Sequence, residues 1–306
     1  MLRQGGLVAF PTETVYGLGA NAFDPAAVAR IFAAKDRPSF DPLIVHLPSP
    51  AEVPRVAFAS DPRLPGLAER FWPGPLTLVL LKRPELPDLV TAGLPAVGVR
   101  VPGHTVARAL LLAAGVPVAA PSANPFGSIS PTTAAHVLEG LGERVDVILD
   151  GGPCAVGVES TVLSLLGERP LILRPGGVTR EELEATLGHE VEVRASSSRP
   201  VSPGQLERHY ATRTPLELLK GPAPARPPVP GRVGLLAFAR APESHGYAAV
   251  EVLSEDRLLA TAAANLFAAL RRLDALGLDR LVAEPVPEEG LGLAILDRLR
   301  RAAARG

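Results

Sequence analysis

Short apolar runs alternate with amphipathic stretches over the first 190 residues, a pattern typical of an α/β domain. Asp24 before Pro25 and Thr179 before Glu182 supply start signals for two helices. Because the predicted strands and helices alternate irregularly, we expect a twisted mixed sheet with flanking helices. The predicted strands cover 7–10, 43–47, 76–81, 97–101, 116–120, 145–149, 161–165 and 171–173, and the predicted helices cover 25–35, 52–58, 64–71, 104–114, 131–141 and 179–187.

The apolar rhythm stops around 196–204 and resumes later as a second α/β pattern. We therefore expect a large domain over 1–195, a linker over 196–214 and a small Rossmann-like α/β domain over 215–306. The proline-rich stretch 221–231 is either more linker or a loop of the second domain. In the second domain, strands are predicted over 233–238, 250–253 and 280–283, and helices over 258–276 and 291–304.

Composition narrows the class of protein. Of the 306 residues, 47% are hydrophobic, which is enough for packed cores. The formal net charge of −1 argues against a basic field suited to nucleic acid or anionic membrane. The single cysteine, Cys154, excludes an internal disulfide framework and a cysteine-built zinc site. No apolar run predicts a signal peptide or approaches the roughly 20 residues of a membrane helix, so we expect a cytoplasmic protein with no membrane partner.

The segment 8–22 changes from an apolar run into threonines, a carboxylate, a tyrosine and two glycines. An α/β sheet presents chemistry at its edge through strands that end in this way. Thr12 and Thr14 offer hydroxyls, and Gly17 and Gly19 would let the backbone approach a ligand closely. The alternative is a strand followed by an ordinary turn.

Several common catalytic motifs are absent from the sequence. It contains no Gly-x-x-x-x-Gly-Lys-Ser/Thr phosphate loop, no Gly-x-Ser-x-Gly nucleophile elbow and no His-Glu-x-x-His zinc motif. Residues 17–22 loosely match a dinucleotide fingerprint, with Asp41 at a suitable distance. The preceding Thr-Glu-Thr-Val-Tyr does not resemble a clean buried strand, which disfavours a nicotinamide cofactor.

Cations and hydroxyls recur where predicted strands end and in the loops beside them. Guanidinium groups bind carboxylate or phosphate bidentately, and an ammonium adds a compact charge. Several cations at one sheet edge therefore indicate a polyanionic ligand, such as a nucleoside triphosphate, with a carboxylate beside it. This interpretation requires distant side chains to converge on one pocket. The residues concerned are Lys35, Arg37, His46, Arg100, Ser122, Asn124, Ser130, Ser160 and Arg174.

Each of these residues alone has a plainer interpretation. Lys35 could complement the C-terminus of a helix, and Arg100 or Arg174 could form a surface ion pair. His46 could be an imidazole of the core. The serines that follow the strand over 116–120 could cap a helix or a turn.

Five motifs, in order and spacing, resemble the YrdC-like family over roughly residues 5–190. The resemblance implies a YrdC-like fold for the first domain. The segment Ser202-Pro-Gly-Gln-Leu-Glu-Arg-His-Tyr210 and the second domain resemble the longer, two-domain members, the L-threonylcarbamoyladenylate synthases, in which the linker lies over the active site. The motifs are Phe10-Pro-Thr-Glu-Thr-Val-Tyr-Gly-Leu-Gly19, Lys35-Asp-Arg-Pro38 with Pro42-Leu-Ile-Val-His46, Ala120-Pro-Ser-Ala-Asn124, Gly157-Val-Glu-Ser-Thr161 and Leu173-Arg-Pro-Gly176.

The resemblance implies a nucleotidyltransferase reaction in which L-threonine, bicarbonate and ATP give threonylcarbamoyl-AMP and pyrophosphate. The product would pass to a tRNA threonylcarbamoyltransferase. A carbamate formed on threonine must attack the α-phosphate, so cations must neutralise the two anions and hold them in line. No covalent enzyme nucleophile is needed. Mg²⁺ is expected with ATP, held largely by phosphate oxygens rather than by a protein metal site.

Matching the motifs residue by residue implies two sets of site residues. Lys35 and Arg37 would supply positioning and charge stabilisation. Tyr210 would close over the site and shield the carbamate from water. The threonine-binding set is Thr14, His46, Arg100, Ala120 and Ser160, with Arg100 on the carboxylate. The ATP-binding set is Lys35, Arg37, Asp41, Ser122, Asn124, Ser130, Arg174 and Tyr210.

Two positions depart from the family pattern, and two rival functions stay open. Asp41 stands where Asn is usual, and Thr212 stands where Pro is usual. A carboxylate beside a triphosphate needs Mg²⁺ or an arginine as its partner. Direct RNA binding is possible but not predicted, because YrdC-like domains have a basic concave face whereas this chain is nearly neutral. The other rival is a generic ATP-dependent carbamoyl-transfer enzyme or a hydrogenase-maturation protein. Hydrogenase-maturation proteins use a related domain but usually add zinc-finger cysteines, which this chain lacks.

Overall fold

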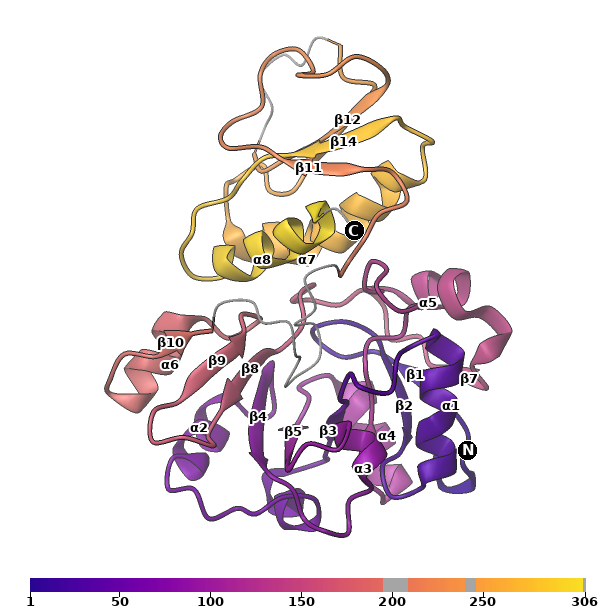
Figure 1. The fold of residues 1–306 in the computed structure, drawn as a ribbon, viewed down its shortest axis with the longest axis vertical. Helices are drawn as coiled ribbons and strands as arrows, with labels where there is room; N and C mark the ends of the chain where they lie inside the picture. Colours follow the sequence, from indigo (N-terminus) through magenta and orange to yellow (C-terminus); the bar gives the residue numbers. More distant parts are fainter. Residues whose placement is uncertain (195–208, 240–245, 305–306) are drawn as a thin grey trace.

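The computed structural model describes residues 1–194, 209–239 and 246–304 of the chain. Each of two domains is built around its own sheet, and helices α7 (Leu259–Asp274) and α8 (Gly292–Ala303) of the second domain lie between the two sheets (Figure 1). This arrangement confirms the predicted fold class. None of the described helices combines the length and the apolar character needed to cross a membrane.

A mixed sheet forms the centre of the first domain. Parallel pairs such as β3–β5 stand beside antiparallel pairs such as β4–β5, as the irregular order of elements predicted. Within the described residues the order across the sheet is β10–β9–β8–β4–β5–β3–β6–β2–β1–β7. The strands are β1 (Val8–Phe10), β2 (Gly17–Asn21), β3 (Ile44–His46), β4 (Leu76–Leu81), β5 (Ala96–Arg100), β6 (Val118–Ala119), β7 (Val147–Ile148), β8 (Thr161–Ser164), β9 (Leu171–Arg174) and β10 (Glu192–Val193).

Most helices of the first domain begin where the sequence predicted. The Asp24 carboxylate accepts hydrogen bonds from the first backbone N–H groups of α1, and Thr179 with Glu182 forms the expected capping box of α6. Thr133 caps α5, so the predicted start of this helix at residue 131 is wrong. The helices are α1 (Pro25–Lys35), α2 (Leu64–Phe71), α3 (Asp88–Thr91), α4 (Thr105–Ala114), α5 (Ala134–Leu141) and α6 (Arg180–Leu187), with 3-10 turns at Leu2–Gln4, Pro50–Arg55 and Gly142–Arg144.

Residues 17–21 form strand β2, which pairs antiparallel with β1. A dinucleotide fingerprint places its glycines in the turn between a strand and a helix, so the nicotinamide alternative is wrong. Gly19 allows close packing rather than close approach of a ligand. A Cβ at this position would lie 2.7 Å from Cγ1 of Val118 and 2.9 Å from Cε1 of Phe10.

The second domain is a parallel sheet with α7 and α8 on the side that faces the first domain (Figure 1). The proline-rich stretch 221–231 lies between β11 and β12, which makes it a loop of this domain. The sequence predicted every strand except the short β11. In the order β11–β14–β12–β13, the strands are β11 (Leu216–Leu218), β14 (Arg280–Ala283), β12 (Val233–Ala237) and β13 (Ala249–Val252).

The apolar core of the second domain extends into the first. Val15 and Val158 of the first domain belong to the same buried cluster as Phe267 of α7. Gly157 adopts a left-handed backbone with φ of 75°, and a Cβ on it would lie only 2.4 Å from the Cα of Ala264 in α7. The backbone of the Gly-Val-Glu-Ser-Thr motif therefore touches α7 directly, and the motif's glycine is a docking residue.

We predict that Gly157→Ala weakens the docking of the two domains. The matched control is Gly152→Ala, because Gly152 has nearly the same φ, 79°, but an added Cβ there meets nothing within 4 Å. Backbone strain alone should cost about 1–2 kcal/mol in both variants. Gly157→Ala should cost about 2–3 kcal/mol more from the clash with α7 and should enlarge the radius of gyration. Urea unfolding and small-angle X-ray scattering measure the two effects. Equal losses of stability in both variants would contradict the docking role.

Candidate active site

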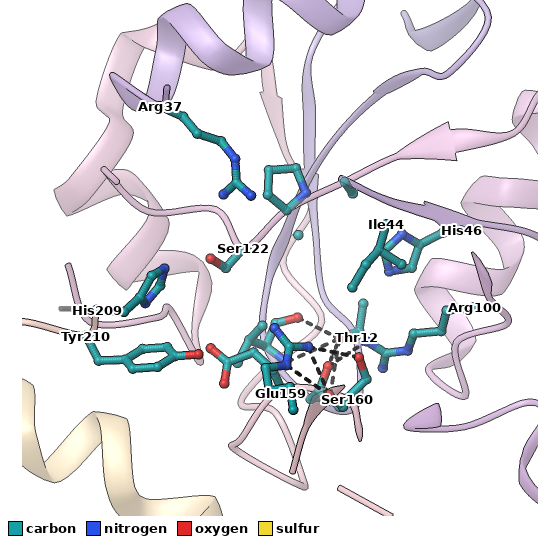
Figure 2. Close-up of a pocket in the computed structure, with 16 residues that line it drawn as sticks. Thr12, Arg37, Ile44, His46, Arg100, Ser122, Glu159, Ser160, His209 and Tyr210 are labelled. Carbon is teal, nitrogen blue, oxygen red and sulfur yellow. Dashed lines mark hydrogen bonds between the residues drawn. The ribbon is translucent and has the colours of Figure 1, made fainter. Parts of the chain in front are cut away.

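One pocket gathers side chains from the first domain together with His209 and Tyr210 of the predicted linker (Figure 2). Nine of the thirteen predicted site residues line it, so the scattered cations and hydroxyls do meet at one place. Lys35, Asp41 and Asn124 do not line the pocket, and neither does Ser130. The lining residues are Thr12, Thr14, Val15, Gly17, Arg37, Ile44, His46, Arg100, Ala120, Pro121, Ser122, Glu159, Ser160, Arg174, His209 and Tyr210.

The pocket has two sides that differ in chemistry. Figure 2 shows Arg37, Ser122 and Tyr210 on one side, with His46 and Arg100 on the other. His46 and Arg100 are register partners in the parallel strands β3 and β5, which explains their proximity. His46 and Ile44, two residues apart in β3, both line the pocket, so it lies against a face of the sheet and not only at its edge.

Arg100 is 4% exposed, so its interpretation as part of a surface ion pair is wrong. Its Nη1 donates to Oγ1 of Thr14 at 2.9 Å, and its Nη2 donates to the carboxylate of Glu13 at 2.6 Å. Glu13 also accepts a hydrogen bond from the backbone N–H of Gly103 at 2.9 Å. Burial acts to raise the pKa of Glu13, but the charge and hydrogen bond of Arg100 outweigh it and lower the pKa. An ionised carboxylate thus fixes Arg100 beside Thr14.

Arg174 and Ser160 connect the two predicted sets of site residues. Nη2 of Arg174 donates to the backbone carbonyl of Ser160 at 2.9 Å and to its Oγ at 3.2 Å. The Ser160 hydroxyl also lies 2.8 Å from that of Thr77. Because Arg174 is only 4% exposed, its interpretation as a surface ion pair is also wrong. The residues predicted for phosphate and for threonine therefore share one wall.

Asp41 lies behind Arg37 and not in the pocket. Its Oδ2 is 2.9 Å from Nη2 of Arg37, which also donates to the carbonyl of Pro42 at 2.9 Å. Burial raises the pKa of Asp41, while the charge of Arg37 opposes this effect. Asp41 thus has the arginine partner that a carboxylate near a triphosphate requires, but it does not line the pocket.

Lys35 and Asn124 lie behind the pocket wall and hold the loop that forms it. Nζ of Lys35 donates to the backbone carbonyl of Ser122 at 2.6 Å and to that of Asn124. The Asn124 side-chain amide donates to the carbonyl of Ser128 at 2.9 Å. Burial and then the charge of Arg37 lower the pKa of Lys35 well below its usual value. Lys35 therefore braces the loop that presents Ser122, rather than the end of its own helix.

Glu159 lines the pocket, and Ser130 supports it from behind. Ser130 Oγ donates to one carboxylate oxygen at 2.5 Å, and Nε of Arg298 in α8 donates to the other at 2.9 Å. Burial acts to raise the pKa of Glu159, but the charges of Arg298 and Arg174 lower it to about 2. The carboxylate is therefore ionised at neutral pH. Ser130 caps no helix, so that interpretation is wrong.

Tyr210 joins the pocket to the second domain. Its ring stacks on Phe267 of α7 with centroids 5.4 Å apart, and the guanidinium of Arg298 lies 5.4 Å from its centre. His209 contacts the same ring at 4.2 Å. Tyr210 is buried and lines the pocket. It belongs to the linker that was expected over the active site. The part of the predicted linker over 196–208 lies outside the described residues.

Buried polar atoms without a hydrogen-bond partner concentrate around this pocket. In the described part of the chain they belong to His46, Asn124, His209, Tyr210, Arg271 and Arg298, and to Asp41, which keeps its ion pair with Arg37. All except Arg271 line the pocket or support its wall. Buried polar groups are normally paired, so a group of unpaired ones indicates a place that a polar ligand or water completes.

Some residues of the site are not among the predicted ones. Glu13 and Glu159 stand inside recognised motifs, but nothing in the pattern shows that each would face an arginine. Arg298 does carry a signal that could be read, since it shares one face of the predicted helix over 291–304 with Ile295 and Leu299, which are apolar. An arginine on an apolar helix face needs a buried partner. The residues without a predicted role are Glu13, Val15, Ile44, Pro121, Glu159, His209 and Arg298, whereas Thr12 was expected only to offer a hydroxyl.

Models of two protein families match the chain. The one described as "Telomere recombination", for Sua5, YciO and YrdC proteins, matches residues 1–176. The one described as "Threonylcarbamoyl-AMP synthase, C-terminal domain" matches residues 178–304. The two matches meet between β9 and α6, before β10, the last strand of the first sheet along the chain.

Curated relatives and a solved structure resemble the chain over nearly its whole length. A threonylcarbamoyl-AMP synthase of Bacillus subtilis is 42% identical over 99% of this chain and 91% of its own. One of Pyrococcus abyssi is 44% identical over 98% of this chain and 91% of its own. The crystal structure of P. abyssi Sua5 complexed with L-threonine superposes with a TM-score of 0.91 at 41% identity, covering 99% of this chain and 92% of that one.

The buried histidines of the pocket predict a loss of stability in acid. Burial, with the charge of Arg100, lowers the pKa of His46 to about 3, and burial lowers that of His209 to about 3. The unfolded chain binds these protons at a pH near 6.5, so stability falls as the pH drops from about 6.5 towards 3. Each histidine contributes a slope of about 1.4 kcal/mol per pH unit.

The test is urea unfolding at several pH values between 6.5 and 4.5. His46→Gln should reduce the slope of unfolding free energy against pH by about 1 kcal/mol per unit. His189→Gln is the control, because His189 is exposed, and it should keep the wild-type slope. A wild-type slope in His46→Gln would contradict a neutral buried imidazole at this position.

Proposed function

The chain belongs to the Sua5, YciO and YrdC family, and from that premise we propose that it makes threonylcarbamoyl-AMP and pyrophosphate from L-threonine, bicarbonate and ATP. One observation carries the proposal: Arg37, Arg100 and Arg174 meet hydroxyl groups in a single buried pocket with two chemically distinct sides. Buried arginines of this kind suit two small anionic substrates held side by side.

The threonine side is built around Arg100. Its guanidinium takes the substrate carboxylate, while Glu13 and Thr14 keep it oriented. His46, neutral because of its burial, and the backbone at Ala120 complete this side, and Ser160 closes it.

The phosphate side uses Arg37, Ser122 and Arg174, which line the pocket directly. Lys35 and Asn124 act through the loop that they hold, and Ser130 and Asp41 act by keeping Glu159 and Arg37 in place. The threonine amine condenses with bicarbonate, which loses water, to give a carbamate. A carbamate oxygen then attacks the α-phosphate as pyrophosphate leaves. The arginines reduce the repulsion between the carbamate and the triphosphate. The protein therefore contributes positioning and charge stabilisation rather than a covalent intermediate.

We infer that Mg²⁺ arrives with ATP. No cluster of three or more histidine, cysteine, aspartate or glutamate side chains suited to a metal occurs in the described residues. Asp41 and Glu159 are each already paired with an arginine. The residues present therefore do not form a metal cage of their own, and phosphate oxygens and water are the ligands that such an ion would use.

Tyr210 and His209 form the wall that separates the pocket from the second domain. Their burial shields the carbamate and the mixed anhydride, both of which water destroys. We propose that this wall moves to admit ATP and closes before reaction. The product then passes to a tRNA threonylcarbamoyltransferase, and we place both steps in the cytoplasm.

The two rival functions fit less well. The arginines of the site face a buried pocket and not an open surface, which suits a small molecule better than RNA. Hydrogenase maturation offers no account of the second domain, whereas the threonylcarbamoyl-AMP synthase C-terminal model matches residues 178–304.

The proposed reaction predicts that pyrophosphate release needs all three substrates. The protein is incubated with ATP, labelled bicarbonate and one amino acid at a time, and pyrophosphate is measured. Threonine should support release, whereas valine, which lacks the hydroxyl, and omission of bicarbonate should each abolish it. Release that is independent of the amino acid would mean simple ATP hydrolysis and would contradict the proposal.

Single arginine variants should affect the KM for ATP and the KM for threonine separately. Losing a charge-assisted hydrogen bond costs about 1.5–3 kcal/mol, so Arg174→Ala and Arg37→Ala should raise the KM for ATP about tenfold or more. Arg100→Gln should raise the KM for threonine by a similar factor and leave that for ATP nearly unchanged. Arg30→Ala is the control, because Arg30 forms an exposed ion pair with Asp146. If all three site variants changed both KM values equally, the two-sided pocket would be wrong.

A further inference from the structure

The pocket-lining carboxylate of Glu159 is a problem for a site that binds phosphates. It lies in the same wall as Arg174, whose charge acts on it, and it is ionised. A buried carboxylate beside a phosphate-binding guanidinium can pair with that guanidinium and compete with the phosphate. Some other group must therefore hold Glu159.

Arg298 of α8 is that group. It is 0% exposed, and its Nε lies 2.9 Å from Oε2 of Glu159. Its own position is fixed from three sides, since its Nη1 donates to the carbonyl of Pro175 and to the carboxylate of Asp297 at 2.8 Å each, and its guanidinium lies against the ring of Tyr210. The second domain thus inserts a fixed cation behind the pocket wall of the first domain.

We propose that Arg298 is a positioning residue for nucleotide binding: it holds Glu159 in an ion pair across the domain interface, so that Glu159 does not turn to Arg174. The second domain is thereby part of the ATP site although none of its described residues from β11 onwards lines the pocket. The inference rests on the proposed function only in taking Arg174 as a phosphate-binding group.

The structure explains why the pair spans two domains. Ser130 satisfies one oxygen of Glu159 from the first domain, and Arg298 satisfies the other from the second. The Arg298 side chain can reach Glu159 only when α8 is docked. ATP affinity is therefore tied to docking, because an undocked second domain releases Glu159 towards Arg174.

Four variants measured by calorimetric ATP binding and by pyrophosphate release test this role. Arg298→Met should weaken ATP binding at least tenfold and change threonine binding less than twofold. Glu159→Gln removes the competing charge itself, so it should weaken ATP binding several-fold less than Arg298→Met does. The double variant Glu159→Gln with Arg298→Met should bind ATP as Glu159→Gln does, because the competing charge is gone and Asp297 keeps its ion pair with Arg301. Arg300→Met is the matched control from the same helix, since Arg300 is 56% exposed in its side chain, and it should bind ATP as wild type does.

Several results would overturn the inference. Unchanged ATP binding by Arg298→Met would contradict it. A double variant that binds ATP as weakly as Arg298→Met would also contradict it, because Arg298 would then act by packing or through Tyr210. Loss of ATP binding in Glu159→Gln would make Glu159 a ligand rather than a group to be restrained. If Arg298→Met does not fold, the comparison of Glu159→Gln with the double variant decides, and the two must bind ATP alike. A wild-type protein that binds ATP but releases no pyrophosphate with threonine would overturn the proposed function and leave this comparison valid.

Discussion

Buried positive charge is the constraint on which the rest of this structure depends. Arg37, Arg100 and Arg174 are each less than a tenth exposed and line one pocket. Charges taken out of water are costly unless they are paired, and arginines that also repel one another are costlier still. The chain meets this constraint with carboxylates placed behind or beside the pocket, so that the cations keep one side turned towards a ligand.

These carboxylates determine much of the architecture around the pocket. Asp41 pairs with Arg37 within one loop, and Glu13 pairs with Arg100 between the segment after β1 and the end of β5. Ser130 of the first domain holds one oxygen of Glu159, and Arg298 of the second domain pairs with the other. These ion pairs within a loop, within a domain and between domains all balance charge around the pocket. Although the strands and loops of the first domain form most of the site, its charge balance depends on the second domain.

The sequence predicted the elements well and the contacts poorly, for physical reasons. Helix α1 could be read from Asp24 and Pro25, since capping acts within four residues. Strand β2 could not, because it lies between β1 and β6, and β6 comes nearly a hundred positions later in the chain. The motifs in the sequence identified the residues of the site. They did not show which of these residues face the pocket. Lys35 is charged and lies in a motif, yet its ammonium donates hydrogen bonds to two backbone carbonyls. Only the three-dimensional path of the chain reveals these contacts.

The backbone at Tyr210 shows how docking and access to the pocket oppose each other. Tyr210 has φ of 62°, a left-handed conformation that costs a residue with a side chain about 1–2 kcal/mol. Its hydroxyl is buried without a partner, which adds to the cost. Stacking on Phe267 and the contact with Arg298 offset these costs, and both come from the second domain. The conformation that closes the pocket is therefore held by the neighbouring domain against the preference of the local chain, so any movement that loosens α7 and α8 also releases Tyr210 from the pocket.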